Sequence, residues 1–198
     1  MAEHELPSPE ELEEQKGNTF TKRVALTTAI YAVFLAVASL GGNNATKEML
    51  LAQQQSSDLW AHYQAKSIRE HQSRVQKLRL EADLLEREPS LKSEGREKLT
   101  KLLGRYGEDE ERYNAEKKEI EKHAKELEHE RDLYRTKDPY FDYGEALLQI
   151  AIVMASIAIL SSSRQVFIFS LVIAVLGGFF VLNGFLLFAQ LPFLHGRH

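Results

Sequence analysis

Three apolar blocks without a charged residue constrain this chain more than any other feature. They cover residues 24–40, 146–160 and 166–191 and contain no Asp, Glu, Lys or Arg. A helix needs about 20 apolar residues to cross a bilayer, and each block is close to that length or exceeds it. We therefore predict three transmembrane helices in a lipid bilayer, although the mean hydropathy of the whole chain is only -0.33.

A charged insert at residues 44–138 separates the first apolar block from the other two. Residues 45–87 contain neither Gly nor Pro and favour a helix, and helix potential resumes after Pro89, which predicts a turn near residues 89–95. Both arms must return to the membrane. The sequence therefore predicts an all-α membrane protein, in which a long antiparallel helical hairpin is inserted between the first and second transmembrane helices.

The second arm of the insert carries a stripe with the seven-residue spacing of a coiled coil. Its members are Leu99, Tyr106, Tyr113, Ile120, Leu127 and Tyr134. The first arm begins a similar repeat with Met49, Ala52, Ser56, Leu59 and Tyr63. A register step near Ala65 would continue it as Ile68, His71, Val75, Leu78, Ala82 and Leu85. Charged residues face the stripe, so a lone hairpin would be marginal and we expect a homo-oligomer.

The expected boundaries follow from these segments. An acidic flexible tail covers residues 1–21, the first transmembrane helix 22–43, the hairpin 44–138, the second transmembrane helix 139–162, and the third with a short tail 163–198. Ala36, Val37 and Ala38 would also suit a signal-peptide cleavage site, but the long acidic leader is atypical of a signal peptide. Lys22, Arg23 and Arg164 favour a cytoplasmic N-terminus and a hairpin on the outer side.

Small residues on two predicted spans would allow close approach of neighbouring helices. They are Ala25, Ala29, Ala32 and Ala36 in the first span, and Ser170, Gly177 and Gly184 in the third. Gln149 and Asn183 are the polar groups of the last two spans. They would form hydrogen bonds between helices or, in a ring of several copies, line a polar path.

The sequence contains no catalytic signature. It has no phosphate-binding loop, no H-E-x-x-H, no G-x-S-x-G and no cysteine, so we expect neither an enzyme nor a cofactor. The hairpin register would bring His62 near His123, but imidazoles on a solvated helix are more often surface residues, and no metal site is expected. Acidic and basic residues alternate, with a net charge of -4, which argues against nucleic acid as a partner.

Leu59, Trp60 and Tyr63 form the aromatic centre of the first arm. They belong either to the coiled-coil core or to a docking surface for a partner helix, because exposed Trp and Tyr are often binding anchors. They lie within the run KEMLLAQQQSSDLWAHYQAK at residues 47–66, which is followed by Ser67 and Ile68.

This run resembles the signature of an uncharacterised bacterial membrane family, domain of unknown function 4337. The resemblance covers residues 24–187 and includes LLQIAIVMASIAIL in the second span. It implies a multi-pass protein of the bacterial inner membrane, with the turn between the last two spans in the cytoplasm and the hairpin in the periplasm. The family has no known activity. We therefore expect a membrane scaffold, spacer or docking protein, with a pore-forming or accessory channel subunit as the alternative.

Overall fold

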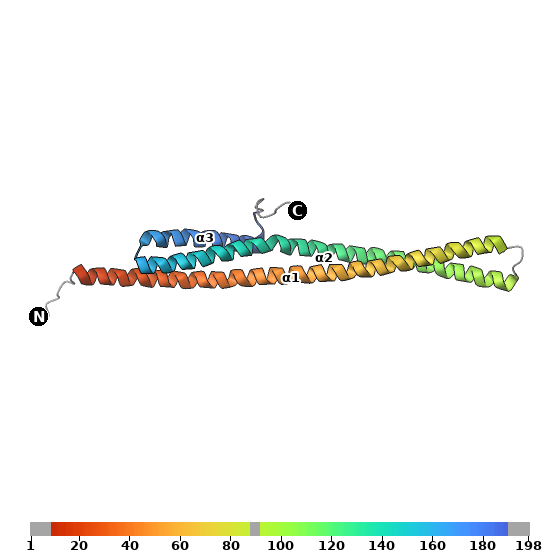
Figure 1. The fold of residues 1–198 in the computed structure, drawn as a ribbon, viewed down its shortest axis with the longest axis horizontal. Coiled ribbons are helices and arrows are strands. Elements are labelled where there is room, and N and C mark those ends of the chain that lie inside the picture. The colour runs from red at the N-terminus through yellow and green to blue at the C-terminus, as the bar shows by residue number, and fades with distance from the viewer. Residues whose placement is uncertain (1–8, 88–91, 190–198) are drawn as a thin grey trace. The chain divides into compact units, whose positions relative to one another are not determined.

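The computed structural model describes residues 9–87 and 92–189, in which all regular secondary structure is α-helical and no strand occurs. The helices are α1 (Pro9–Arg87), α2 (Ser93–Ser161) and α3 (Arg164–Leu186) (Figure 1). Each helix contains a segment long and apolar enough to cross a membrane. The predicted all-α class and the three apolar helices are therefore confirmed.

The first two helices continue without a break across the expected boundaries between the spans and the hairpin, near residues 43–44 and 138–139. Gly41 and Gly42 lie inside α1, and Pro139 lies inside α2. A proline removes one helical hydrogen bond but does not end a helix that packing supports on both sides. The two glycines serve a close contact, because a Cβ atom at either position would meet the ring or Cβ of Phe141.

The predicted turn near residues 89–95 lies partly outside the described residues, as do the first eight residues and residues 190–198. Its described end is the start of α2. There the backbone carbonyl of Lys92 accepts hydrogen bonds from the N–H groups of Gly95 and Arg96, at 3.0 and 3.1 Å.

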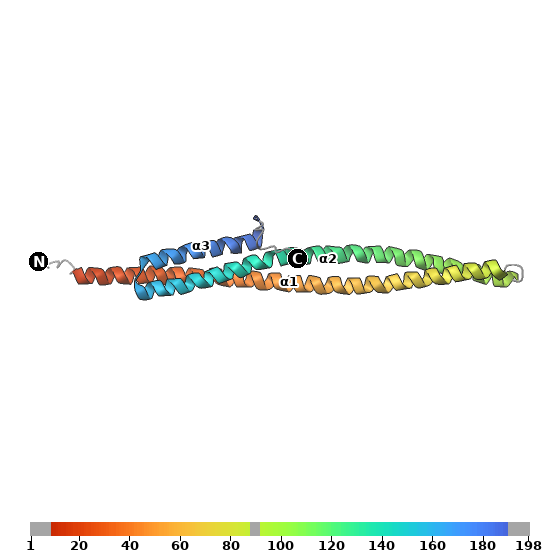
Figure 2. The same ribbon diagram turned by 45° about the horizontal axis from the view of Figure 1, so that its top comes forward.

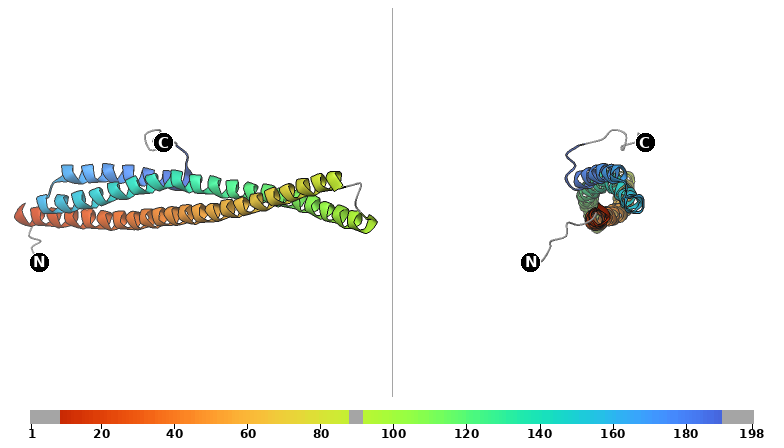
Figure 3. Two further views of the ribbon diagram at one scale, coloured as in Figure 1. Left: turned by 45° about the vertical axis from the view of Figure 1, so that its right-hand side comes forward. Right: turned by 90° about the vertical axis from the view of Figure 1, so that its left-hand side faces the viewer.

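The chain divides into two compact units. The three-helix unit comprises Met1–Glu48 and Leu133–His198, and the two-helix unit comprises Met49–Asp132. In the three-helix unit, α3 lies beside the C-terminal part of α2, as Figures 2 and 3 show from different directions.

The core of the three-helix unit contains residues from all three helices. Those from α1 recur every seven residues. The buried core residues are Val24, Tyr31, Ala38 and Ala45 from α1, Phe141, Leu148, Ala151 and Ala155 from α2, and Ala174 and Val181 from α3. Outside this core the same helices expose many large apolar side chains, including Leu26, Val33, Val153 and Leu176. Helices that are apolar on all sides suit a lipid environment.

The predicted small face of α3 lies against α2. Ser170, Gly177 and Gly184 are buried, and the Ser170 hydroxyl donates a hydrogen bond to the carbonyl oxygen of Ala151 at 2.7 Å. A Cβ atom on Gly177 would lie 3.1 Å from the carbonyl oxygen of Gly144 on α2. The absence of side chains here lets the two backbones approach closely.

The predicted small face of α1 is not the face that packs within the chain. Ala25, Ala29, Ala32 and Ala36 are all exposed. The neighbouring face, which carries Val24 and Tyr31, is buried instead. That face continues with Ala38 and Ala45, so it combines two large side chains with two alanines, and the burial of Val24 and Tyr31 removes more apolar surface from the surroundings than four alanines would.

Candidate docking groove between α1 and α2

In the two-helix unit, the α1 segment 49–87 and the α2 segment 93–132 lie side by side with opposite chain directions. Contacts from the start of the α1 segment reach the end of the α2 segment. Arg131 donates to the side chain of Gln53 at 3.0 Å, and the Ser56 hydroxyl donates to the Ala124 carbonyl at 3.4 Å. Further along, Lys77 reaches Glu110 at 3.4 Å. The order of these contacts reverses along α2, as an antiparallel pair requires.

The first part of the α1 repeat faces α2 as the sequence predicted, but the predicted register step near Ala65 is wrong. The same three- and four-residue spacing continues without interruption through Lys66, Glu70, Ser73 and Lys77, of which Glu70 and Ser73 are buried. Ile68, Leu78 and Leu85, which the predicted step placed in the contact, are exposed. The apolar pattern alone predicts the wrong contact face for this part of α1, because charged residues occupy the positions that face α2.

Those inner charges are paired across the two helices. The carboxylate of Glu70 accepts hydrogen bonds from Lys117 at 2.5 Å and from Asn114 and Arg74, each at 3.0 Å. Arg74 also donates to Glu110 at 2.7 Å. The Lys117 ammonium holds the pKa of Glu70 below its ordinary value, and the same hydrogen bond raises the pKa of Lys117. These partners allow the Glu70 carboxylate to be buried, because an unpaired charge in the same place would be strongly destabilising.

The seven-spaced stripe of α2 is half-buried along its whole length, at Leu99, Tyr106, Tyr113, Ile120, Leu127 and Tyr134. The first five lie in the two-helix unit and Tyr134 lies in the three-helix unit. The fully buried position of α2 within the two-helix unit is Ala124, whose backbone receives Ser56. The stripe therefore borders the contact between the helices and stays partly accessible.

Trp60 and Tyr63 both have contacts within the chain. Their rings meet edge to face, with centroids 5.3 Å apart, and the Trp60 indole N–H donates to Glu128 at 2.9 Å. The Lys117 ammonium lies 5.7 Å from the centroid of the Tyr63 ring. Both side chains are half-buried, so they hold the two helices together and leave only part of their surface for a partner.

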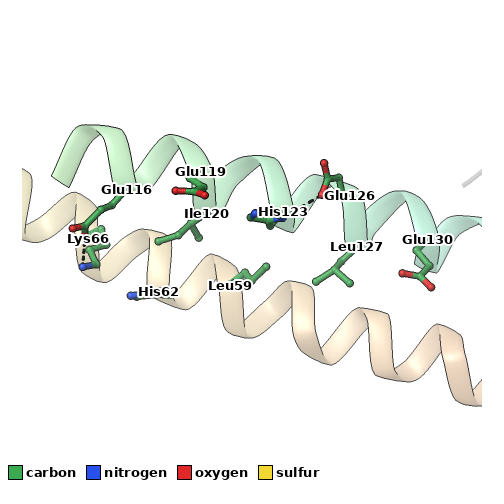
Figure 4. Close-up of a pocket in the computed structure, with 10 residues that line it drawn as sticks. All are labelled: Leu59, His62, Lys66, Glu116, Glu119, Ile120, His123, Glu126, Leu127 and Glu130. Atoms are coloured by element: carbon green, nitrogen blue, oxygen red, sulfur yellow. Dashed lines mark hydrogen bonds and ion pairs between the residues drawn. The ribbon is translucent and has the colours of Figure 1, made fainter. Parts of the chain in front are cut away.

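Leu59, the third predicted docking residue, lines a groove between the two helices (Figure 4). The groove has a volume of about 780 Å³. Leu59 from α1 and Ile120 and Leu127 from α2 supply its apolar lining, and Figure 4 shows Leu59 lying between the other two along the groove. The remaining lining residues are Lys66, His62, His123, Glu116, Glu119, Glu126 and Glu130.

Carboxylates dominate the charge of this groove. Four glutamates line it against one lysine. Lys66 forms an ion pair with Glu116 and holds the pKa of that carboxyl below its ordinary value. Glu119 and Glu130 are exposed, and Glu126 lies 3.2 Å from Nδ1 of His123. The groove thus combines an apolar floor with a negatively charged rim.

The structure brings His62 and His123 to the same groove, as the hairpin register implied. Within the described residues no cluster of three or more His, Cys, Asp or Glu side chains has a geometry suited to a metal ion. The contact of His123 with Glu126 joins two residues of α2 that both line this groove.

The two polar residues of the predicted spans hydrogen bond within their own segments. Gln149 is exposed and donates to Glu145, one turn earlier in α2, at 3.2 Å. Asn183 is buried near the end of α3, where its side chain exchanges hydrogen bonds with the backbone of Ala189 at 2.7 and 2.9 Å. Asn183 therefore stabilises the C-terminal end of α3.

The sequence profile of the family described as "Domain of unknown function (DUF4337)" matches residues 20–187, which is most of the chain and includes both units. The chain belongs to this family. Neither a curated protein nor a solved structure matches the chain. The DUF4337 description assigns no chemistry, so the groove has to be interpreted from its own residues.

Sequence reasoning identified the apolar part of the groove but not its rim. Leu59, Ile120 and Leu127 follow recognisable repeats, whereas Glu119, Glu126 and Glu130 belong to a segment in which nearly every residue is charged. A usable signal was present, because residues three or four apart share one face of a helix, and the groove residues Glu116, Ile120, His123, Leu127 and Glu130 follow alternating steps of four and three.

Proposed function

We propose that this DUF4337 protein is a non-enzymatic scaffold or docking protein of the bacterial inner membrane. In this proposal its three apolar helices span the bilayer, and the antiparallel α1–α2 segments form a coiled-coil hairpin that receives a helix of a partner protein. The observation that carries the proposal is the groove with an apolar floor of Leu59, Ile120 and Leu127 under a rim of glutamates.

The chemistry of the groove favours a basic amphipathic helix as the occupant. Ile120 and Leu127 lie two helical turns apart, a distance of about 10 Å at 1.5 Å per residue. Apolar residues at positions i, i+3 or i+4, and i+7 of a partner helix repeat over the same distance. Lys or Arg residues beside that apolar face would meet Glu119, Glu126 and Glu130, and this complementarity gives specificity and faster association.

The same proposal assigns an orientation. Lys22 and Arg23 precede the first apolar segment and Arg164 begins α3, so these cations favour a cytoplasmic N-terminus and a cytoplasmic turn between the last two spans. The groove would then face the periplasm.

A synthetic peptide tests the groove directly. The probe is a helical peptide with Leu at i, i+3, i+4 and i+7 and with Lys beside this face, added to the full-length protein in a nonionic detergent. Trp60 is the chain's single tryptophan and directly follows Leu59, so its fluorescence reports on binding. We expect saturable binding that weakens as salt is added, because the rim contacts are electrostatic.

Two double variants separate the groove from general electrostatics. Glu119→Lys with Glu130→Lys reverses the rim and should weaken binding by about tenfold, which corresponds to about 1.4 kcal/mol. Glu97→Lys with Glu108→Lys changes the net charge equally at exposed α2 positions outside the groove and should leave binding within about twofold of the wild type. Equal losses in both variants, or equal binding of a peptide with Glu in place of Lys, would contradict the proposal.

A further inference from the structure

The exposed side of α1 in the two-helix unit carries an apolar seam of its own. Ile68, Leu78 and Leu85 are 59, 57 and 77% exposed. His71 and Ala82 are also exposed and Val75 is half-buried. These six residues follow the alternating three- and four-residue spacing of a coiled-coil seam, and we call them the outer seam.

The outer seam lies on a different face of α1 from the residues that contact α2. Glu70, Ser73 and Lys77 occupy the inner positions, where Glu70 and Lys77 bond to α2. Charged residues also flank the outer seam, namely Arg74, Arg79, Glu81 and Glu86. Large apolar side chains in a row between charged residues mark a protein contact in water rather than a lipid-facing surface.

We propose that a second copy of this chain covers the outer seam, with the two α1 segments antiparallel. The inference goes beyond the proposed docking function and agrees with the homo-oligomer that the sequence predicts. In this register Ile68 lies opposite Leu85 of the second copy, His71 opposite its Ala82, and Val75 opposite its Leu78. In this arrangement apolar residues face apolar residues along the seam, except where His71 faces Ala82. The segment is therefore complementary to itself, as a two-fold symmetric contact requires.

The flanking charges select the antiparallel arrangement. In a parallel pair, Arg74 would face Arg79 of the other copy and Glu81 would face its Glu86, so both flanks would carry like charges. In the antiparallel pair, Arg74 lies beside Glu81 of the other copy. The Arg74 side chain is half exposed next to its contacts with Glu70 and Glu110, which leaves room for this third carboxylate.

Disulfide cross-linking distinguishes the two arrangements, because the natural chain has no cysteine. The variants Ile68→Cys and Leu85→Cys, each with a different affinity tag, are expressed together and oxidised in the native membrane. A disulfide needs Cα atoms about 4.4–6.8 Å apart. Residues 68 and 85 lie about 26 Å apart along one helix at 1.5 Å per residue, so an in-register parallel pair cannot form the disulfide between residues 68 and 85.

We expect cross-linked dimers that carry both tags and few that carry one tag twice. A matched pair with Gln76→Cys in place of Leu85→Cys should give no such product, because residue 76 lies off the seam. Dimers with the same tag twice would indicate parallel packing, and no cross-linked dimer would indicate that another molecule covers the seam. Either result overturns the proposal.

A variant that disrupts the outer seam tests this proposal independently of the proposed docking groove. Ile68→Glu with Leu78→Glu introduces two charges on exposed positions, so the helix should keep its circular dichroism spectrum while the dimer is lost. The control Arg69→Glu with Gln76→Glu places two carboxylates on the same helix off the seam and should stay dimeric. The groove peptide should still bind the disrupted variant, so a failed seam and a failed groove give different results.

Discussion

Glu70 illustrates at the scale of one residue why charge pairing decides this helix contact. It occupies an inner position of the α1 repeat, where an apolar residue would be expected, and only 5% of its surface is exposed. Lys117, Asn114 and Arg74 satisfy its carboxylate, and these partners come from both helices. A buried charge of this kind contributes little net stability but makes any unpaired alternative register costly.

Replacing Glu70 should therefore destabilise the two-helix unit more than replacing an exposed glutamate. Glu70→Ala leaves Lys117 without its closest partner, and we expect a loss of about 1–3 kcal/mol. Glu94→Ala removes a solvent-exposed pair with Lys98 and should cost less than about 0.5 kcal/mol. Amide hydrogen exchange of residues 66–78 in the solubilised protein measures the difference. Equal protection in the two variants would show that the Glu70 network is dispensable.

At the scale of helices, close backbone approach positions α3 on α2. Gly144 and Gly177 face one another, and a Cβ atom on Gly144 would lie 2.6 Å from a methyl group of Val181. Van der Waals packing of this kind drives helix association where the surroundings are as apolar as the helices. Gly178 is the adjacent residue, and a Cβ atom there would meet nothing within 4 Å.

This contrast predicts opposite outcomes for two neighbouring substitutions. Gly177→Ile should force α3 away from α2 and destabilise the three-helix unit by about 1–3 kcal/mol, as overpacking does. Gly178→Ile adds the same side chain in open space and should be nearly neutral. Thermal unfolding of both variants in one detergent compares them. Similar melting temperatures would mean that the close contact between Gly144 and Gly177 does not limit stability.

For the whole molecule, three spans would place the two ends of the chain on opposite sides of a membrane. In the proposed orientation, the α2 residues of the two-helix unit lie in the periplasm, and the connection between α2 and α3 lies in the cytoplasm. This orientation follows from the cations flanking the apolar segments.

Cysteine labelling tests this orientation without background, because the chain has no natural cysteine. Gly104→Cys lies at an exposed position of α2, and Gln165→Cys lies at an exposed position near the start of α3 and keeps Arg164 intact. A membrane-impermeant maleimide applied to spheroplasts should label residue 104 directly and residue 165 only after the membrane is disrupted. The reverse pattern would invert the proposed orientation.

Much of the architecture could be predicted from local properties of the sequence. Uncharged apolar runs locate the three membrane-compatible helices, because desolvating charge is costly wherever a helix meets lipid. Helix propensity and the stripe from Leu99 to Tyr134 located the long helices, and the small face of Ser170, Gly177 and Gly184 does lie against α2.

The tertiary structure decided which faces meet. The sequence pattern predicted that the seam through Ile68, Leu78 and Leu85 is the face of α1 that contacts α2. It also indicated that the alanines from Ala25 to Ala36 are the packing face of the first span. Both faces are exposed. Glu70 and Lys77 take the inner positions because carboxylates and cations of α2 lie opposite them, and a sequence does not state which charges will be neighbours. The sequence by itself therefore determined helices and apolar segments, while pairing between distant side chains determined the groove and the outer seam.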